Sequence, residues 1–340
     1  MQTNIIHNQD CLIGLKELPD VSIDCCVTSP PYFGLRDYGY EGQLGLENLP
    51  EEYVKNMVRV FMEVKRILKP EGTLWLNLGD SYAGSGKGIG DNFTGRWKQG
   101  TNKGSRTVTQ KNRNINNGLK PKDMIGIPWM VAFALRTNGW YLRQDIIWNK
   151  PNPMPESVVD RCTKAHEYIF FLSKSGKYYF DQEAIKTTIQ DASVQRLLQN
   201  IEAQKGSDRV PGKTNGTMKA VLKGYKHRGK GDKKLTGHSG NFDSEGNLIG
   251  DGKANKKSVW TVTTKPFRDA HFATFPEDLI VDCIKAGCPE GGIVLDPFMG
   301  AGTTALVARK LNRNFIGFEL NPEYIDIAKK RLINELGMFQ

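Results

Sequence analysis

The segment that most restricts the fold of this chain lies near its C-terminus, between Gly292 and Glu319. A short apolar run at 293–295 is followed by a glycine-containing turn, a helical pattern that begins near Thr303, and a second apolar run at 314–318. The order strand, turn, helix, strand predicts a parallel βαβ unit in an open α/β sheet. Its turn would let a ligand approach the backbone, and its helix would present free N–H groups.

The ligand of this turn is not decided by its glycines. Residues Gly300 to Ala305 fit the Gly-x-Gly-x-x-Ala pattern of a dinucleotide site, and Glu319 ends the next strand, where an acid can accept hydrogen bonds from ribose hydroxyls. Asp296 stands just before the turn. A carboxylate there would repel a pyrophosphate but suits a cofactor with an ammonium group, such as S-adenosylmethionine.

A second constellation lies at the other end of the chain, where the segment Thr28 to Tyr32 reads Thr-Ser-Pro-Pro-Tyr directly after the apolar run 23–27. Two consecutive prolines remove two N–H donors and stiffen the segment. Ser29 Oγ and the Pro30 carbonyl could accept hydrogen bonds from an amino group, and Tyr32 could stack on an aromatic base. The pattern therefore predicts a clamp for the exocyclic amino group of a nucleobase, with a Pro-Pro turn that packs at the rim as the alternative.

Helices and strands are expected to alternate between these two poles, which indicates a mostly parallel sheet. The expected helices span 50–68, 125–138 and 322–336, and the segment 69–72, which contains Pro70 and Gly72, should end the first of them. Further strands are expected at 73–78, 141–148 and 167–172.

Positive charge is concentrated outside these elements. Residues 83–123 hold nine Lys or Arg against two Asp or Glu, and 184–257 hold 15 against seven, so these segments together exceed the +10 of the whole chain. Basic segments of low hydrophobicity can order along a phosphate backbone with counterion release, or they can be solvated loops with no partner. Their position beside a base-modifying site favours nucleic acid.

Six cysteines occur without a Cys-x-x-Cys pair or neighbouring histidine spacing, which predicts free thiols and no zinc. No run of about 18 apolar residues and no leader-like N-terminus is found, so we expect a cytoplasmic protein without membrane association.

Taken in this order, with the clamp first and the segment Asp296 to Gly302 reading Asp-Pro-Phe-Met-Gly-Ala-Gly second, the two motifs resemble the β-class amino DNA methyltransferases of the N4-cytosine/N6-adenine family. The resemblance covers most of the chain. It implies a doubly wound, mostly parallel seven-stranded sheet in circularly permuted order with its last strand antiparallel. It also implies three regions: a catalytic half at 1–182 with a basic insertion at 83–123, a target-recognition insertion at 183–258, and a cofactor-binding half at 259–340.

The resemblance also assigns residues. The expected catalytic residues are Ser29, Pro30, Pro31 and Tyr32. The expected S-adenosylmethionine site comprises Asp10, Cys11, Phe275, Asp296, Pro297, Phe298, Gly300, Gly302 and Glu319. Within the recognition insertion, Arg196, Arg209, Lys226, Arg228 and Lys230 are candidates for phosphate or guanine contacts. The expected partner is double-stranded DNA, and the resemblance leaves open a homodimer and a cognate restriction endonuclease.

The expected reaction begins with extrusion of the target base from the duplex, followed by in-line attack of its amino nitrogen on the sulfonium methyl group. Serine at the first clamp position is the family's usual signature for N4 of cytosine, whereas aspartate is usual for N6 of adenine. Cytosine is therefore expected, with adenine as the alternative. A protein-glutamine methyltransferase and a non-catalytic DNA-binding regulator are remoter alternatives.

Overall fold

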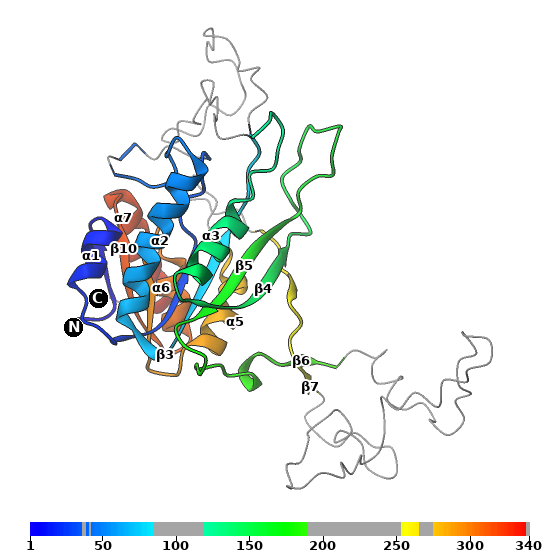
Figure 1. Ribbon diagram of the computed structural model, residues 1–340. Helices are drawn as coiled ribbons and strands as arrows, with labels where there is room; N and C mark the ends of the chain where they lie inside the picture. The colour runs from blue at the N-terminus through cyan, green and yellow to red at the C-terminus, as the bar shows by residue number, and fades with distance from the viewer. Residues whose placement is uncertain (36–38, 41, 84–118, 190–252, 265–274, 338–340) are drawn as a thin grey trace, which may run out of the picture. The chain divides into compact units, whose positions relative to one another are not determined.

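The computed structural model of the chain describes residues 1–35, 39–40, 42–83, 119–189, 253–264 and 275–337 (Figure 1). Two compact units are distinguished. The larger comprises Met1–Ala184 together with Lys257–Gln340, and the smaller comprises Ile185–Lys256. In the described part of the smaller unit, β6 (Thr187–Thr188) pairs with β7 (Lys253–Ala254) in an antiparallel ladder. A single turn of 3₁₀ helix, Glu183–Ile185, lies at the boundary.

The larger unit is built on one twisted sheet whose strand order is β1-β10-β9-β2-β3-β5-β4-β8. All neighbours in this order are parallel except β5, which is antiparallel to both β3 and β4. The strands are β1 (Ile5–Asn8), β2 (Ile23–Thr28), β3 (Leu68–Leu78), β4 (Tyr141–Asn149), β5 (His166–Ser173), β8 (Val259–Thr261), β9 (Ile293–Asp296) and β10 (Asn314–Glu319).

Helices cover both faces of this sheet (Figure 1). The layer α1 (Cys11–Glu17), α2 (Pro50–Ile67) and α3 (Ile127–Thr137) packs over Cys26, Leu74 and Leu76. The other layer consists of α5 (Glu277–Gly287), α6 (Thr303–Lys310) and α7 (Pro322–Leu336), with Gly287 set directly against Trp75 and Cys25. Because strand residues alternate between faces, Cys25 and Cys26 are buried under different helical layers, which is why both positions are apolar.

The helix α2 shows how local sequence sets an element. It begins at Pro50, whose fixed φ suits the first helical turn, and its buried residues recur at intervals of three and four: Tyr53, Met57, Val60, Phe61, Val64 and Ile67. The segment 69–72, which was expected to end the helix, lies inside the following strand instead. The helix ends at Ile67 and β3 begins at Leu68, and pairing with β2 jumps from Ile23↔Leu68 to Cys25↔Thr73, so 69–72 bulges out of the ladder.

The predicted doubly wound, mostly parallel α/β fold is confirmed. The described part of the sheet has eight strands instead of seven, because the three-residue β8 adds to β4 at the edge. The antiparallel strand is β5, the last strand before the smaller unit. The edge strand β1 was not predicted, because its four residues are only half-buried and give no continuous apolar run.

Candidate active site

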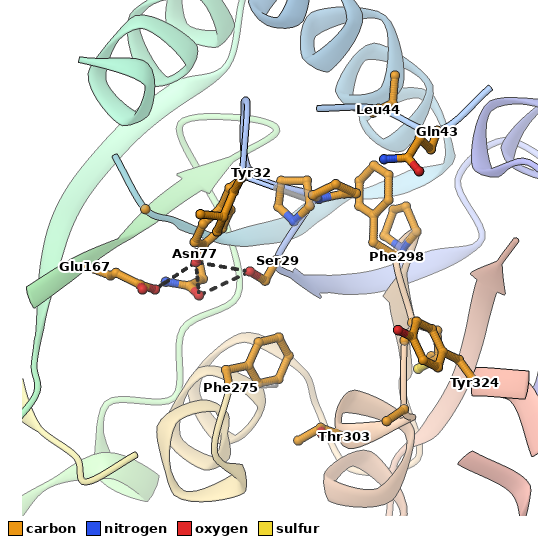
Figure 2. Close-up of a pocket in the computed structure, with 18 of the residues that line it drawn as sticks. Ser29, Tyr32, Gln43, Leu44, Asn77, Glu167, Phe275, Phe298, Thr303 and Tyr324 are labelled. Atoms are coloured by element: carbon orange, nitrogen blue, oxygen red, sulfur yellow. Dashed lines mark hydrogen bonds between the residues drawn. The ribbon is translucent and has the colours of Figure 1, made fainter. Parts of the chain in front are cut away.

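A cavity of about 960 Å³ opens at the edge of the sheet where its parallel strands end (Figure 2). Open α/β sheets place their ligand sites at this edge because each strand there leads into a loop that can carry functional groups. Since β5 runs in the opposite direction, its first residues, His166 and Glu167, reach the same edge. The strand order gives the cavity two regions, one beside β1, β10 and β9 and the other beside β2, β3, β5 and β4.

The four predicted clamp residues lie together in the second region. Ser29, Pro30, Pro31 and Tyr32 follow the C-terminal end of β2 directly and all line the cavity. The Tyr53 hydroxyl on α2 donates to the Pro31 carbonyl at 2.8 Å, which ties the second proline to the helix beneath it. The clamp is therefore held from below as well as by its own prolines.

Side chains from β3 and β5 complete a polar network around the clamp (Figure 2). The Tyr32 hydroxyl lies 2.7 Å from Glu167 Oε2 and 3.1 Å from Asn77 Oδ1, and Ser29 Oγ lies 3.2 Å from Asn77 Oδ1. The Asn77 amide nitrogen donates to the Tyr168 carbonyl at 3.0 Å, which turns its oxygen toward the clamp. Burial, reinforced by the Glu167 carboxylate, raises the pKa of the Tyr32 phenol well above its ordinary value, so the phenol remains a donor.

A positively charged side chain, that of Lys150, lies on the outer side of this network. Lys150 Nζ, at the end of β4, forms an ion pair with Glu167 Oε1, and both side chains are more than four-fifths buried. The same ammonium lies 4.1 Å from the centre of the Trp148 ring, within the range of a cation–π contact. A buried pair of this kind fixes the direction of the carboxylate more than it adds stability.

Tyr32 also depends on a glycine. A Cβ atom at Gly79 would lie 2.5 Å from a ring carbon of Tyr32, well inside van der Waals contact. The ring therefore rests on the bare backbone that follows β3.

The region beside β1, β10 and β9 contains most of the predicted cofactor residues. Asp10, Cys11, Phe275, Pro297, Phe298, Gly300 and Glu319 line the cavity. Glu319 accepts from the Gly300 N–H at 2.8 Å and from the Asn321 N–H at 2.9 Å, and burial raises the pKa of its carboxyl. Each carboxylate oxygen keeps a further lone pair for a hydroxyl.

Asp10 and Cys11 form the other wall of that region. Asp10 caps α1 by accepting from the Leu12 and Ile13 N–H groups at 2.9 and 3.0 Å. Burial, together with the adjacent Asp10, raises the pKa of the Cys11 thiol to about 12, so a neutral thiol faces the cavity. This wall suits an uncharged ring better than a phosphate.

The carboxylate of Asp296, which was expected to suit a cofactor with an ammonium group, points away from the cavity. Its side chain belongs to a residue that is 1% exposed, and it does not line the cavity. Its oxygens accept from the hydroxyls of Thr28 and Thr304, at 2.5 and 2.6 Å, and from the Phe298 N–H at 3.0 Å. Asp296 therefore holds the loop from beneath, and its assignment to the cofactor site stays a prediction.

Gly302 also lies behind the cavity wall. It is the residue before α6, with φ 79°, and a Cβ there would lie 2.6 Å from Ala328 of α7. This position requires glycine because its backbone is left-handed and because α7 packs closely against it. A substitution here would therefore affect a ligand indirectly, by moving Gly300.

The predicted site residues did not include Asn77, Gly79, Lys150 or Glu167, which also line the cavity. Each stands within two residues of the end of a predicted strand, and all are brought together only by the sheet order. Their polar character and their positions at strand ends could have marked them as site candidates. The sequence alone does not show which strands are neighbours, so it could not show that these residues meet.

The five basic residues predicted to contact DNA, Arg196, Arg209, Lys226, Arg228 and Lys230, lie outside the described residues. Within the described ranges, no cluster of three His, Cys, Asp or Glu side chains could hold a metal ion. All six cysteines are free thiols, and Cys25 and Cys26 are fully buried, away from the cavity. No helix in the described part of the chain is long and apolar enough to span a membrane.

The cavity brings the Ser-Pro-Pro-Tyr segment, the glycine loop and Glu319 together at one edge of the sheet, the arrangement that the sequence predicted for a group-transfer enzyme acting on bases. Residues 23–330 match the model of the DNA methylase family N6_N4_Mtase, and the chain belongs to that N6/N4 DNA methylase family. It is 43% identical over 324 residues to the type II methyltransferase M.SmaI of Serratia marcescens, covering 95% of this chain and 89% of that protein. It is 41% identical over 326 residues to M.Cfr9I of Citrobacter freundii, covering 96% and 86% of the two chains.

Solved structures share the fold. PvuII DNA methyltransferase (cytosine-N4-specific) superposes with a TM-score of 0.61 at 17% identity, covering 99% of this chain and 88% of that one. TTHA0409 of Thermus thermophilus, complexed with S-adenosyl-L-methionine, superposes with a TM-score of 0.55 at 20% identity, covering 98% and 95%.

Proposed function

We propose that this protein transfers a methyl group from S-adenosylmethionine to the N4 amino group of cytosine in double-stranded DNA, as the modification enzyme of a type II restriction-modification system. The observation that carries the choice of cytosine is the serine at the first clamp position, with its Oγ 3.2 Å from Asn77 Oδ1. Membership of the N6/N4 family supplies the reaction class, and type II methyltransferases are similar over nearly the whole chain.

The cavity fits the proposed cofactor. Glu319 would accept hydrogen bonds from the two ribose hydroxyls, and Asp10, the neutral Cys11 thiol and Phe298 would border the adenine. Phe275 and Thr303, which face the same cavity in Figure 2, would border the methionine part. When bound, S-adenosylmethionine supplies an electrophilic methyl group on a positively charged sulfur.

The chain's own residues would bind and orient the base. Ser29 Oγ and the Pro30 carbonyl would accept hydrogen bonds from the cytosine amino group, which favours a more tetrahedral and reactive nitrogen. Tyr32 would stack on the extruded base, with its hydroxyl fixed by Glu167. The acceleration would come mainly from alignment, because holding reactants at near-attack distance accounts for a large part of many enzymatic rates.

The cytosine-N4-specific PvuII enzyme has the same fold, which supports the proposal without deciding the base.

The test is mass spectrometry of nucleosides from unmethylated genomic DNA incubated with the purified protein and S-adenosylmethionine. N4-methylcytosine is the expected product. N6-methyladenine would retain the family chemistry and overturn the choice of base. Absence of either product, with the cofactor bound, would favour a non-catalytic DNA-binding role.

A further inference from the structure

The clamp contains two hydroxyl groups and one amide oxygen whose hydrogen bonds can run in two directions. Ser29 Oγ, the Tyr32 hydroxyl and Asn77 Oδ1 lie within 3.1–3.4 Å of one another. Only an arrangement in which the Ser29 proton points away from the base leaves Ser29 Oγ able to accept from an amino group. An aspartate at this position would accept in any case, whereas a serine depends on its neighbours.

Glu167 breaks this symmetry. Its Oε2 lies 2.7 Å from the Tyr32 hydroxyl, which is the shortest contact that this hydroxyl makes and the one with a charged acceptor. A hydroxyl has one proton, so a Tyr32 proton donated to Glu167 is not available to Asn77. Asn77 Oδ1 then receives the Ser29 proton at 3.2 Å.

Three contacts hold this arrangement in place. Lys150 pairs with the other oxygen of Glu167. Asn77 Nδ2 donates to the Tyr168 carbonyl at 3.0 Å and to Glu167 Oε2 at 3.4 Å, which keeps the amide oxygen on the clamp side. Figure 2 shows Glu167, Asn77 and Ser29 in sequence along one wall of the cavity, with Tyr32 above them.

We propose that Glu167 is a positioning residue that sets the direction of the hydrogen bonds in the clamp and so makes Ser29 an acceptor for the amino group of the base. This inference rests on the proposed function, because it specifies how a serine clamp serves that reaction. Glu167 does not touch the base in this account, and acts through Tyr32 and Asn77.

Glu167→Gln tests the direction of the bonds. Lys150 needs an acceptor, so the new amide would turn its oxygen to Lys150 and its NH₂ to the Tyr32 hydroxyl. The Tyr32 proton would then go to Asn77 Oδ1 or Ser29 Oγ. Because the Asn77 oxygen can accept from both hydroxyls, the loss comes from a Tyr32 proton that occupies a lone pair of Ser29 Oγ. We expect kcat for methyl transfer to genomic DNA to fall at least tenfold, while the Kd for S-adenosylmethionine changes less than twofold. Glu63→Gln, which neutralises one of the two carboxylates paired with Arg66 on α2 outside the cavity, is the matched control and should leave kcat unchanged.

Tyr32→Phe distinguishes this role from simple support of the ring. Without the phenol hydroxyl there is no competing proton, so Asn77 Oδ1 accepts from Ser29 whether residue 167 is Glu or Gln. The double variant Tyr32→Phe/Glu167→Gln should therefore be at least threefold faster than Glu167→Gln alone. If the double variant is as slow as or slower than Glu167→Gln, or if Glu167→Gln retains wild-type kcat, the proposal is wrong.

A second cycle keeps the test open if Glu167→Gln does not yield folded protein. Asn77→Ala should lower kcat at least fivefold in the wild type, and should cause no further loss in a Ser29→Ala background, because the acceptor is already absent. Independent, multiplicative losses would overturn the inference. Absence of any N4-methylcytosine from the wild-type protein would instead refute the proposed function, so the two failures are distinguishable.

Discussion

The Thr28 hydroxyl donates a hydrogen bond to Asp296 Oδ1 at 2.5 Å, although the two residues are 268 positions apart in the chain. Each is the last residue of its strand, in β2 and β9, which are neighbours in the sheet. The bond thus joins the strand that leads into the clamp to the strand that leads into the glycine loop. Asp296 also accepts from Thr304 at the start of α6, so one buried carboxyl links the two functional regions.

This link predicts a specific pH dependence of stability. Burial raises the pKa of Asp296 from 3.8 to about 6, although its hydrogen bonds from Thr28 and Thr304 oppose the shift. Between about pH 4 and pH 6, the Asp296 carboxyl is therefore protonated in the folded state and ionised in the unfolded state. The contribution of Asp296 to the free energy of unfolding is greatest below pH 4 and falls as pH rises to about 6, by at most about 3 kcal/mol.

Asp296→Asn removes this titration and should be measured by urea unfolding between pH 4 and pH 8. The free energy of unfolding of the wild type minus that of the variant should decrease over that interval and then level off. Curves that stay parallel across the whole range would contradict the assignment of a raised pKa.

Gly79→Ala tests the support of Tyr32. The added methyl would lie 2.5 Å from the ring, so the ring or the backbone after β3 must move. Overpacking of this kind costs about 1–3 kcal/mol, and we expect kcat to fall about tenfold or more with little change in S-adenosylmethionine binding. Gly176→Ala is the control, since its Cβ would be 3.7 Å from Tyr141 in ordinary contact. Equal activity of the two variants would show that Tyr32 tolerates displacement.

Removal of the clamp groups themselves should separate chemistry from base capture. Ser29→Ala deletes one acceptor and should lower kcat by about tenfold with little effect on DNA affinity, because a single hydrogen bond to the reacting group is lost. Tyr32→Ala should weaken base capture as well, seen as a smaller fluorescence increase of 2-aminopurine placed at the target base. Unaltered turnover in both variants would refute the assignment of the clamp.

Glu319→Gln should act on the cofactor alone. An amide in place of the carboxylate turns an NH₂ group toward one of its two present donors, the Gly300 or Asn321 N–H, and leaves fewer acceptors for a ribose. Titration calorimetry should show S-adenosylmethionine affinity reduced about tenfold or more, with DNA affinity retained. Glu323→Gln, on the exposed face of α7, is the matched control. Equal cofactor affinity in the two variants would show that Glu319 does not bind the cofactor.

The sequence predicted most of the fold because its elements carry strong local signals. The helix at Pro322–Leu336 has a proline at its start and apolar residues at helical spacing, and its predicted bounds are those observed. The strand that precedes Ser29 was found for the same reason, as a short apolar run that ends in turn residues. In contrast, β1 and β8 are short edge strands, and their assignment depends on pairing with β10 and β4.

The site was predicted where a motif is contiguous and missed where it is assembled by the sheet. Ser29 and Tyr32 belong to one pentapeptide, whereas Glu167 reaches Tyr32 only because β5 is antiparallel and adjacent to β3. Asp296 shows the opposite limit. The motif located Asp296 at the end of its strand, but it did not predict where the side chain points. That direction is set by hydrogen bonds from Thr28 and Thr304, which lie outside the motif.

Salt dependence tests the part of the chain whose charge is highest. If the basic segments follow the phosphate backbone, the logarithm of the DNA association constant should fall linearly with the logarithm of salt concentration, with a slope of about −0.9 per neutralised phosphate. Arg228→Ala/Lys230→Ala should make this slope shallower by about one to two units. Lys329→Ala/Lys330→Ala, which removes the same charge from the exposed face of α7, should leave the slope unchanged. If both double variants alter it equally, net charge and not the 183–258 segment governs DNA affinity; a flat dependence in the wild type would mean that these segments do not follow phosphates.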